Sequence, residues 1–166
     1  VLCSNTSNKY LEEVNNGYRV YRTASYGNFL STSLSPQLIY KLYKCKNKYD
    51  IIHVHLPDPM AMIALLLIKP KCKIVLHWHG DVDFDKYSKM KYLYKILETK
   101  VIKLSNQIIF PTTIHLTESH VYNLIEDKAN VITYPFNTRD LLSLKIDNDI
   151  VEGYKAMDKK IILYAV

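Results

Sequence analysis

Short apolar runs alternate with longer amphipathic stretches along most of the chain. The runs are rich in β-branched residues, and several are apolar at consecutive positions, among them Ile51-Ile52, Ile74-Val75-Leu76 and Ile108-Ile109-Phe110. Strands that are apolar on both faces are typical of a parallel sheet covered by helices. The pattern predicts strands at residues 1–3, 18–23, 50–55, 73–78, 107–110, 130–134 and 160–166.

Four of the stretches between these runs have the period of an α-helix. Pro36 and Pro59 each stand where the first turn of a helix accepts proline. The predicted helices cover residues 36–46, 59–69, 86–104 and 113–127. Regular alternation of strands and helices predicts an α/β fold with a doubly wound, mostly parallel sheet that has helices on both faces.

The composition excludes several classes of protein. Of the 166 residues, 48% are apolar, which is enough for a core and argues against disorder. The net charge of +6 favours an anionic partner: nucleic acid, a phosphorylated metabolite or an anionic membrane surface. The three cysteines form no zinc pattern, and the longest apolar run, at residues 60–68, is too short to span a bilayer. We therefore expect a cytoplasmic protein.

Four histidines lie within or directly after two of the predicted strands, close to their carboxyl ends. Ligands of open α/β sheets bind outside the carboxyl ends of the strands, which is where His55 and His79 fall. If the two strands are parallel neighbours, His55 and His79 open onto one crevice. His53 and His77 lie two residues earlier, and we expect them to be core histidines packed against helices.

The segments YDIIHVHLPDPMA and KIVLHWHGD resemble the amino-terminal domain of glycosyltransferase family 4. QIIFPTTIHLTES, NVITYPFN and KKIILYAV are similar, in the same order, to later segments of that family. The resemblance implies one Rossmann-like half of a GT-B fold, on the acceptor side of a retaining enzyme of hexosyltransferase type. Such an enzyme moves a sugar from a nucleotide-sugar to a glycan or lipid-linked acceptor in polysaccharide or cell-envelope synthesis.

The resemblance also divides the chain. Residues 1–140 correspond to the acceptor-side domain without its first strand and glycine loop, residues 141–159 to a linker, and residues 160–166 to the first strand of a second, donor-binding domain. We expect this portion alone to lack transferase activity. The lacking strand lies centrally in the resembled fold, between residues 1–3 and 50–55, so we expect a defect in the sheet and self-association.

The resemblance assigns the reaction centre to His79 and Asp81, and it implies no metal and no cofactor beyond the nucleotide-sugar. His79 would bond to a sugar hydroxyl, while Asp81 would hold the His79 ring or accept a bond from the acceptor. For Trp78, a core position and stacking on a sugar ring are both open. The substrate-binding candidates are His55, Pro57, Asp58, Trp78, Gly80 and Thr112.

The predicted helix at residues 86–104 has an apolar stripe surrounded by lysines and tyrosines. The stripe consists of Met90, Leu93, Leu97, Val101 and Leu104. The basic face is either a solvated surface or a contact with anionic lipid at the inner face of the cell membrane, as a lipid-linked acceptor would favour. The membrane-contact candidates are Lys89, Lys91, Tyr92 and Lys95.

Two other function classes remain as alternatives. A metal-dependent hydrolase could use the two His-x-His pairs, and a nucleic-acid-binding module could use the lysines and tyrosines. The lysines cluster on a predicted helix and no RNA-binding motif is present, so we expect no nucleic acid. The alternating Asp81, Asp83 and Asp85 do not match a calcium loop, and we interpret them as an acidic helix start that Asp85 caps.

Overall fold

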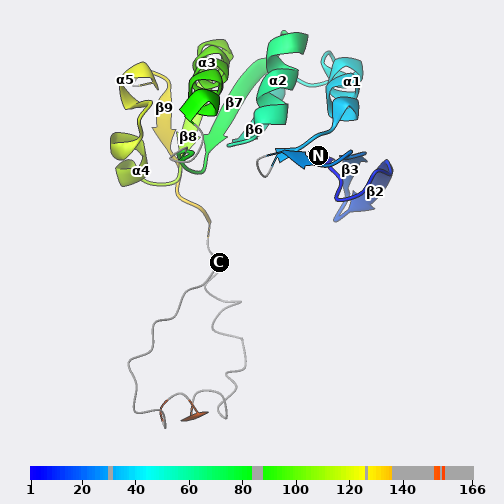
Figure 1. The fold of residues 1–166 in the computed structure, drawn as a ribbon, viewed down its shortest axis with the longest axis horizontal. Helices are drawn as coiled ribbons and strands as arrows, with labels where there is room; N and C mark the ends of the chain where they lie inside the picture. The colour runs from blue at the N-terminus through cyan, green and yellow to red at the C-terminus, as the bar shows by residue number, and fades with distance from the viewer. Residues whose placement is uncertain (30–31, 84–87, 126, 136–151, 154, 156–166) are drawn as a thin grey trace. The chain divides into compact units, whose positions relative to one another are not determined.

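A computed structural model describes residues 1–29, 32–83, 88–125, 127–135, 152–153 and 155 (Figure 1). The chain divides into two units, Val1–Thr133 and Tyr134–Val166, and the helices and strands given below belong to the first. Of the expected linker at 141–159, only three residues are described, and the expected strand at 160–166 lies outside the described residues.

The first unit is built on a four-stranded parallel sheet in the order β6-β7-β8-β9. Its strands are β6 (Ile51–Leu56), β7 (Lys73–Trp78), β8 (Gln107–Phe110) and β9 (Ala129–Val131). Helices follow the strands, as expected for an α/β fold, and they flank the sheet (Figure 1). They are α1 (Pro36–Cys45), α2 (Pro59–Ile68), α3 (Ser88–Leu104), α4 (Thr113–Glu118) and α5 (Tyr122–Ile125). The predicted fold class is therefore confirmed.

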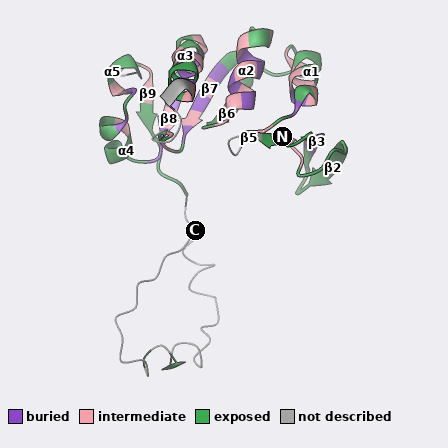
Figure 2. Ribbon diagram, viewed as in Figure 1, coloured by how far each residue is buried: buried purple, intermediate pink, exposed green. Residues whose placement is uncertain are grey.

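The described core lies on one face of this sheet. Alternate residues of β6 and β7 are buried against α2, α3 and α5, while the residues between them are half-buried or exposed. Figure 2 shows the buried sides of α2 and of the strands in purple. The continuous apolar runs had predicted burial on both faces, but the core cluster draws on one: Val54, Leu56, Ile74, Leu76, Trp78, Ile108 and Phe110 from the strands.

A second, three-stranded sheet has the order β1-β3-β2. It contains β1 (Leu2–Ser4), β2 (Leu11–Asn15) and β3 (Tyr18–Thr23), with β2 antiparallel to β3. The hairpin turns at Asn16 and Gly17, whose φ angles of 47° and 83° suit a two-residue turn of the primed type. The pattern of apolar residues missed β2, because four of its five residues are exposed. The short strands β4 (Asn28–Phe29) and β5 (Thr32–Ser33) form a further pair.

The strands on either side of the expected gap do not pair with each other in the described sheets. β1 pairs with β3, and β6 pairs with β7. A cavity of about 820 Å³ is lined by both β1 and β6, together with residues of α1 and α2. β1 and β6 thus lie in different sheets among the described residues. A defect caused by a lacking strand stays a prediction, as does self-association.

Two helix predictions need correction. The stripe of α3 was partly wrong: Leu93 is 52% exposed, and the buried side chains are Tyr94, Glu98, Val101 and Ile102. The periodicity of apolar residues places the polar Glu98 on the exposed face, although it is buried, and so predicts a partly wrong side of the helix as the buried face. The single helix expected at 113–127 is two helices, because Ser119 is extended with ψ 137° and ends α4. The predicted cap Asp85 lies outside the described residues.

Helix α2 supplies a test of the core with a matched control. Leu65 is 1% exposed and Leu67 is 65% exposed, on the same helix. In the full-length protein, we expect Leu65→Ala to lower the free energy of unfolding by about 2–5 kcal/mol, because it removes buried methyl groups and leaves a cavity. Leu67→Ala should change it by less than about 0.5 kcal/mol. Urea unfolding measures both, and equal effects would contradict this assignment of the buried face.

Candidate active site at the ends of β6 and β7

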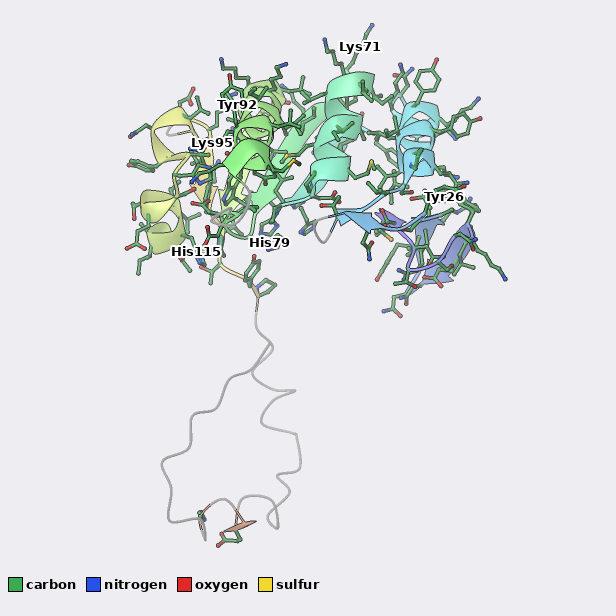
Figure 3. The ribbon with its side chains drawn as sticks, in the orientation of Figure 1. Tyr26, Lys71, His79, Tyr92, Lys95 and His115 are labelled. Atoms are coloured by element: carbon green, nitrogen blue, oxygen red, sulfur yellow. The ribbon has the colours of Figure 1, made fainter. Side chains whose placement is uncertain are left out.

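The parallel register of β6 and β7 brings the four predicted histidines into one cluster. His55 pairs with His77 in the register, and the backbone N–H of His79 donates to the carbonyl of Leu56 at 3.0 Å. His55 Nδ1 lies 2.7 Å from His79 Nε2, and His53 Nε2 lies 3.3 Å from His77 Nδ1. The rings stack with centroids 4.5–5.3 Å apart. The expectation that both strands end at one edge of the sheet is confirmed, and Figure 3 labels His79 there.

The inner histidines are not core residues, which corrects the sequence expectation. His53 is exposed and His77 is half-buried, because side chains alternate along a strand and Val54 and Leu76 take the core face. Partial burial, and then the neighbouring rings, lower the pKa of His53, His77 and His79. The three rings are therefore mainly neutral at pH 7, as ring nitrogens that accept hydrogen bonds must be.

The carboxylate of Asp81 contacts Trp78, Ser119 and His120. Oδ1 accepts from Trp78 Nε1 at 2.9 Å and from the Ser119 hydroxyl at 2.8 Å. Oδ2 accepts from the backbone N–H of His120 at 3.0 Å and lies 2.9 Å from His120 Nδ1. Burial alone would raise the pKa of Asp81, but these hydrogen bonds outweigh it and lower that pKa. Three of these contacts tie Asp81 to the turn before α5, and the fourth ties it to Trp78 of β7. This structural role was not expected from the sequence.

A buried carboxylate continues this network. His120 Nε2 lies 2.7 Å from Glu98 Oε2, and the Glu98 side chain is only 3% exposed. Burial raises the pKa of Glu98 more than its hydrogen bond with His120 lowers it. Burial alone would lower the pKa of His120, but its bonds to Glu98 and Asp81 raise it. The sequence analysis missed both residues, since nothing in a single sequence pairs positions 98 and 120.

The structure gives three of the other candidates local roles. Trp78 is 3% exposed and stacks on Phe110 with ring centroids 5.9 Å apart, so its ring belongs to the core. Asp58 caps α2 by accepting from the N–H of Ala61 at 3.0 Å. Thr112 caps α4 by accepting from the N–H of His115 at 3.1 Å.

The remaining two strand-end candidates border open space or solvent. A Cβ atom added to Gly80 would meet no atom within 4 Å. Pro57 is exposed. These two positions leave the end of the sheet accessible, beside the pair of His55 and His79.

The basic face of α3 lies beside Asp81. Lys91, Tyr92 and Lys95 are exposed, while the side chain of Lys89 lies outside the described part of the structure. Figure 3 labels Tyr92 and Lys95 on this helix. A hollow of about 310 Å³ is lined by Asp81, Val82, Asp83, Lys91, Tyr94, Lys95 and His120. No helix among the described residues is long and apolar enough to cross a membrane.

Three histidines are close enough to share a metal ion. One ligand nitrogen each from His53, His55 and His77 lies within 4.8 Å of the others. Among the described residues, this group contains no carboxylate, so Asp81 and Asp83 take no part in it.

Comparison with known proteins gives the family. The family model described as Glycosyltransferase Family 4 matches residues 1–139. The chain is also 23% identical over 124 residues to the O-antigen chain mannosyltransferase C of Escherichia coli, an alignment that covers 75% of this chain and 33% of that protein. The chain thus spans about a third of the length of this relative. Because the family model covers most of the sequence, the chain belongs to glycosyltransferase family 4.

Proposed function

We propose that this chain is the acceptor-side domain of a retaining glycosyltransferase of hexosyltransferase type. The enzyme would move a sugar from a nucleotide-sugar to a glycan or lipid-linked acceptor. One observation carries the proposal: in a family 4 domain, His55 and His79 meet at 2.7 Å where two parallel strands end. The similarity to an O-antigen chain mannosyltransferase of Escherichia coli supports hexosyl transfer to a growing chain.

In this proposal, His79 contacts the sugar and His55 orients His79. A retaining transfer builds up positive charge on the sugar ring and releases a diphosphate. A neutral imidazole stabilises this process by a hydrogen bond to a sugar hydroxyl, provided that the ring is held in place. The 2.7 Å contact with His55 restricts the orientation of the His79 ring, and one of the two nitrogens in it carries the proton.

Asp81 acts as a positioning residue. Its three contacts with Ser119 and His120 fix the segment that follows β7 against the turn before α5. Gly80 lies between His79 and this anchored carboxylate, and the space beside it accommodates an acceptor. Asp81 therefore contributes by placing His79 and Gly80 rather than by moving a proton.

The exposed face of α3 is the part of the domain that we propose to meet a membrane surface. Lys91 and Lys95 supply positive charge, and Tyr92, which is 73% exposed, lies between them in the sequence. Cationic and aromatic side chains together favour the headgroup region of an anionic bilayer, where a lipid-linked acceptor resides.

Substitution of His79 tests the reaction centre. In the full-length protein, His79→Ala should lower kcat/KM at least about tenfold, or about 1.4 kcal/mol, because it removes a bond made to the sugar in the transition state. The measurement is release of nucleotide from the donor in the presence of acceptor. His115→Ala is the matched control, because His115 is exposed on α4. Normal turnover by His79→Ala would refute the proposed role.

Metal removal separates a transferase from the metal-dependent hydrolase alternative. We propose that transfer needs no metal cofactor, so dialysis of the full-length protein against EDTA should leave the rate of sugar transfer unchanged within about twofold. The rate is compared before and after dialysis and again after Zn²⁺ or Mg²⁺ is added back. Loss of activity that a metal restores would support the alternative.

The network around Asp81 predicts a pH-dependent stability. The pKa of His120 is raised in the folded state, so protonated His120 stabilises the fold. This stabilisation is complete below the ordinary pKa of histidine and is lost as pH rises through the pKa in the folded state. The pKa of Asp81 is lowered in the folded state, so ionised Asp81 also stabilises the fold. This stabilisation is lost in acid, as pH falls through the pKa of Asp81 in the folded state. The network is therefore strongest between these two limits.

His120→Gln should consequently destabilise the full-length protein more at about pH 6 than at about pH 9. Urea unfolding at both pH values measures the difference from the unsubstituted protein. His115→Gln controls for loss of an exposed histidine and should show no such trend. A difference that grows toward pH 9 would contradict the assigned charge on His120.

A further inference from the structure

The histidine cluster has the spacing of a metal site. His53 Nε2 and His77 Nδ1 are 3.3 Å apart. Two nitrogens bound to one tetrahedral Zn²⁺ at about 2.0–2.1 Å are separated by about 3.3 Å, so this pair already has the required separation. A ring nitrogen of His55 lies within 4.8 Å of both. We propose that His53, His55 and His77 bind a divalent first-row transition metal ion, with water at a fourth position.

The backbone that carries these rings is well supported. β6 and β7 pair over six residues in parallel register, with His55 directly opposite His77. On the other face of the same strands, Val54 and Leu76 are packed in the core. Ligands on paired strands hold their positions more closely than ligands on loops. Only rotation of the imidazole rings is then needed to direct three lone pairs at one point.

The chemistry of the ligands selects the class of metal. Three imidazoles without a carboxylate suit Zn²⁺, Ni²⁺ and Cu²⁺, whereas Mg²⁺ and Ca²⁺ require oxygen ligands. His53 and His55 are exposed, so an ion can reach the cluster from solvent. Exposure also leaves room for the water molecule that completes a three-histidine site.

His79 is not a ligand in this proposal but contacts the ligand His55. Metal-bound histidines usually use their second ring nitrogen for a hydrogen bond that fixes the orientation of the ring. His55 has this arrangement: Nδ1 lies 2.7 Å from His79 Nε2, which leaves Nε2 of His55 for the metal. The metal site thus shares His55 with the proposed reaction centre, but it depends on His53 and His77, to which the proposed transfer assigns no role.

Isothermal titration calorimetry of the full-length protein with Zn²⁺ tests the inference. The protein is stripped with EDTA, freed of any polyhistidine tag and titrated near pH 7.5. We expect one equivalent of Zn²⁺ to bind, and Mg²⁺ to give no signal. His53→Gln and His77→Gln should each weaken Zn²⁺ binding at least about tenfold, while His115→Gln should leave it unchanged. Urea unfolding without metal checks that each variant is folded.

Several outcomes would overturn the proposal. They are absence of saturable Zn²⁺ binding, binding that survives the double variant His53→Gln/His77→Gln, and equal loss in His115→Gln. Loss of binding in His120→Gln but not in His53→Gln would instead place the ion at the network of Asp81 and Glu98. The readout is binding and not turnover, so it remains decisive if the His79→Ala test of transfer fails.

Discussion

The parallel pairing of β6 with β7 is the constraint on which the candidate site depends. Side chains alternate along a strand, so burial of Val54 and Leu76 on the core face forces His53, His55 and His77 onto the other face. A slip of one residue in either strand would move the histidines of that strand into the core. The apolar core therefore sets the position of the polar cluster.

A second constraint is the carboxylate of Glu98 inside the core. A buried charge is costly unless it is paired, and His120 pairs it at 2.7 Å. The same imidazole contacts Asp81 on its other nitrogen, so α3, the end of β7 and the turn before α5 are joined through one ring. This also explains the interruption between α4 and α5: the N–H of His120 donates to Asp81 instead of to a carbonyl of α4.

Some residues at the strand ends have structural contacts, while His55 and His79 are accessible for chemistry. Trp78, Asp81 and the capping residues Asp58 and Thr112 are committed to contacts within the domain. His55 and His79 contact each other at the accessible end of the sheet. Rigid neighbours around an exposed pair of imidazoles are what both proposals require, since transfer needs a ring of fixed orientation and metal binding needs ligands of fixed spacing.

The sequence by itself determined the family resemblance, the α/β class and much of the element positions. Three predicted strands have the observed bounds, at 18–23, 73–78 and 107–110, and two helices begin at the predicted Pro36 and Pro59. Local periodicity and proline geometry carry this information. The hairpin at β2 was missed because its strand is mostly exposed, although Asn16-Gly17 is a turn signal that was present.

Only the tertiary structure decided which polar residues meet. The burial of Glu98, its pairing with His120, the anchoring of Asp81 and the exposure of His53 all depend on packing between elements far apart in the sequence. An analysis of periodicity places every carboxylate on the surface, and it interprets every continuous apolar run as a strand buried on both faces. Neither assumption holds here, because a partner 22 residues away neutralises Glu98 and because the described core covers one face of the sheet.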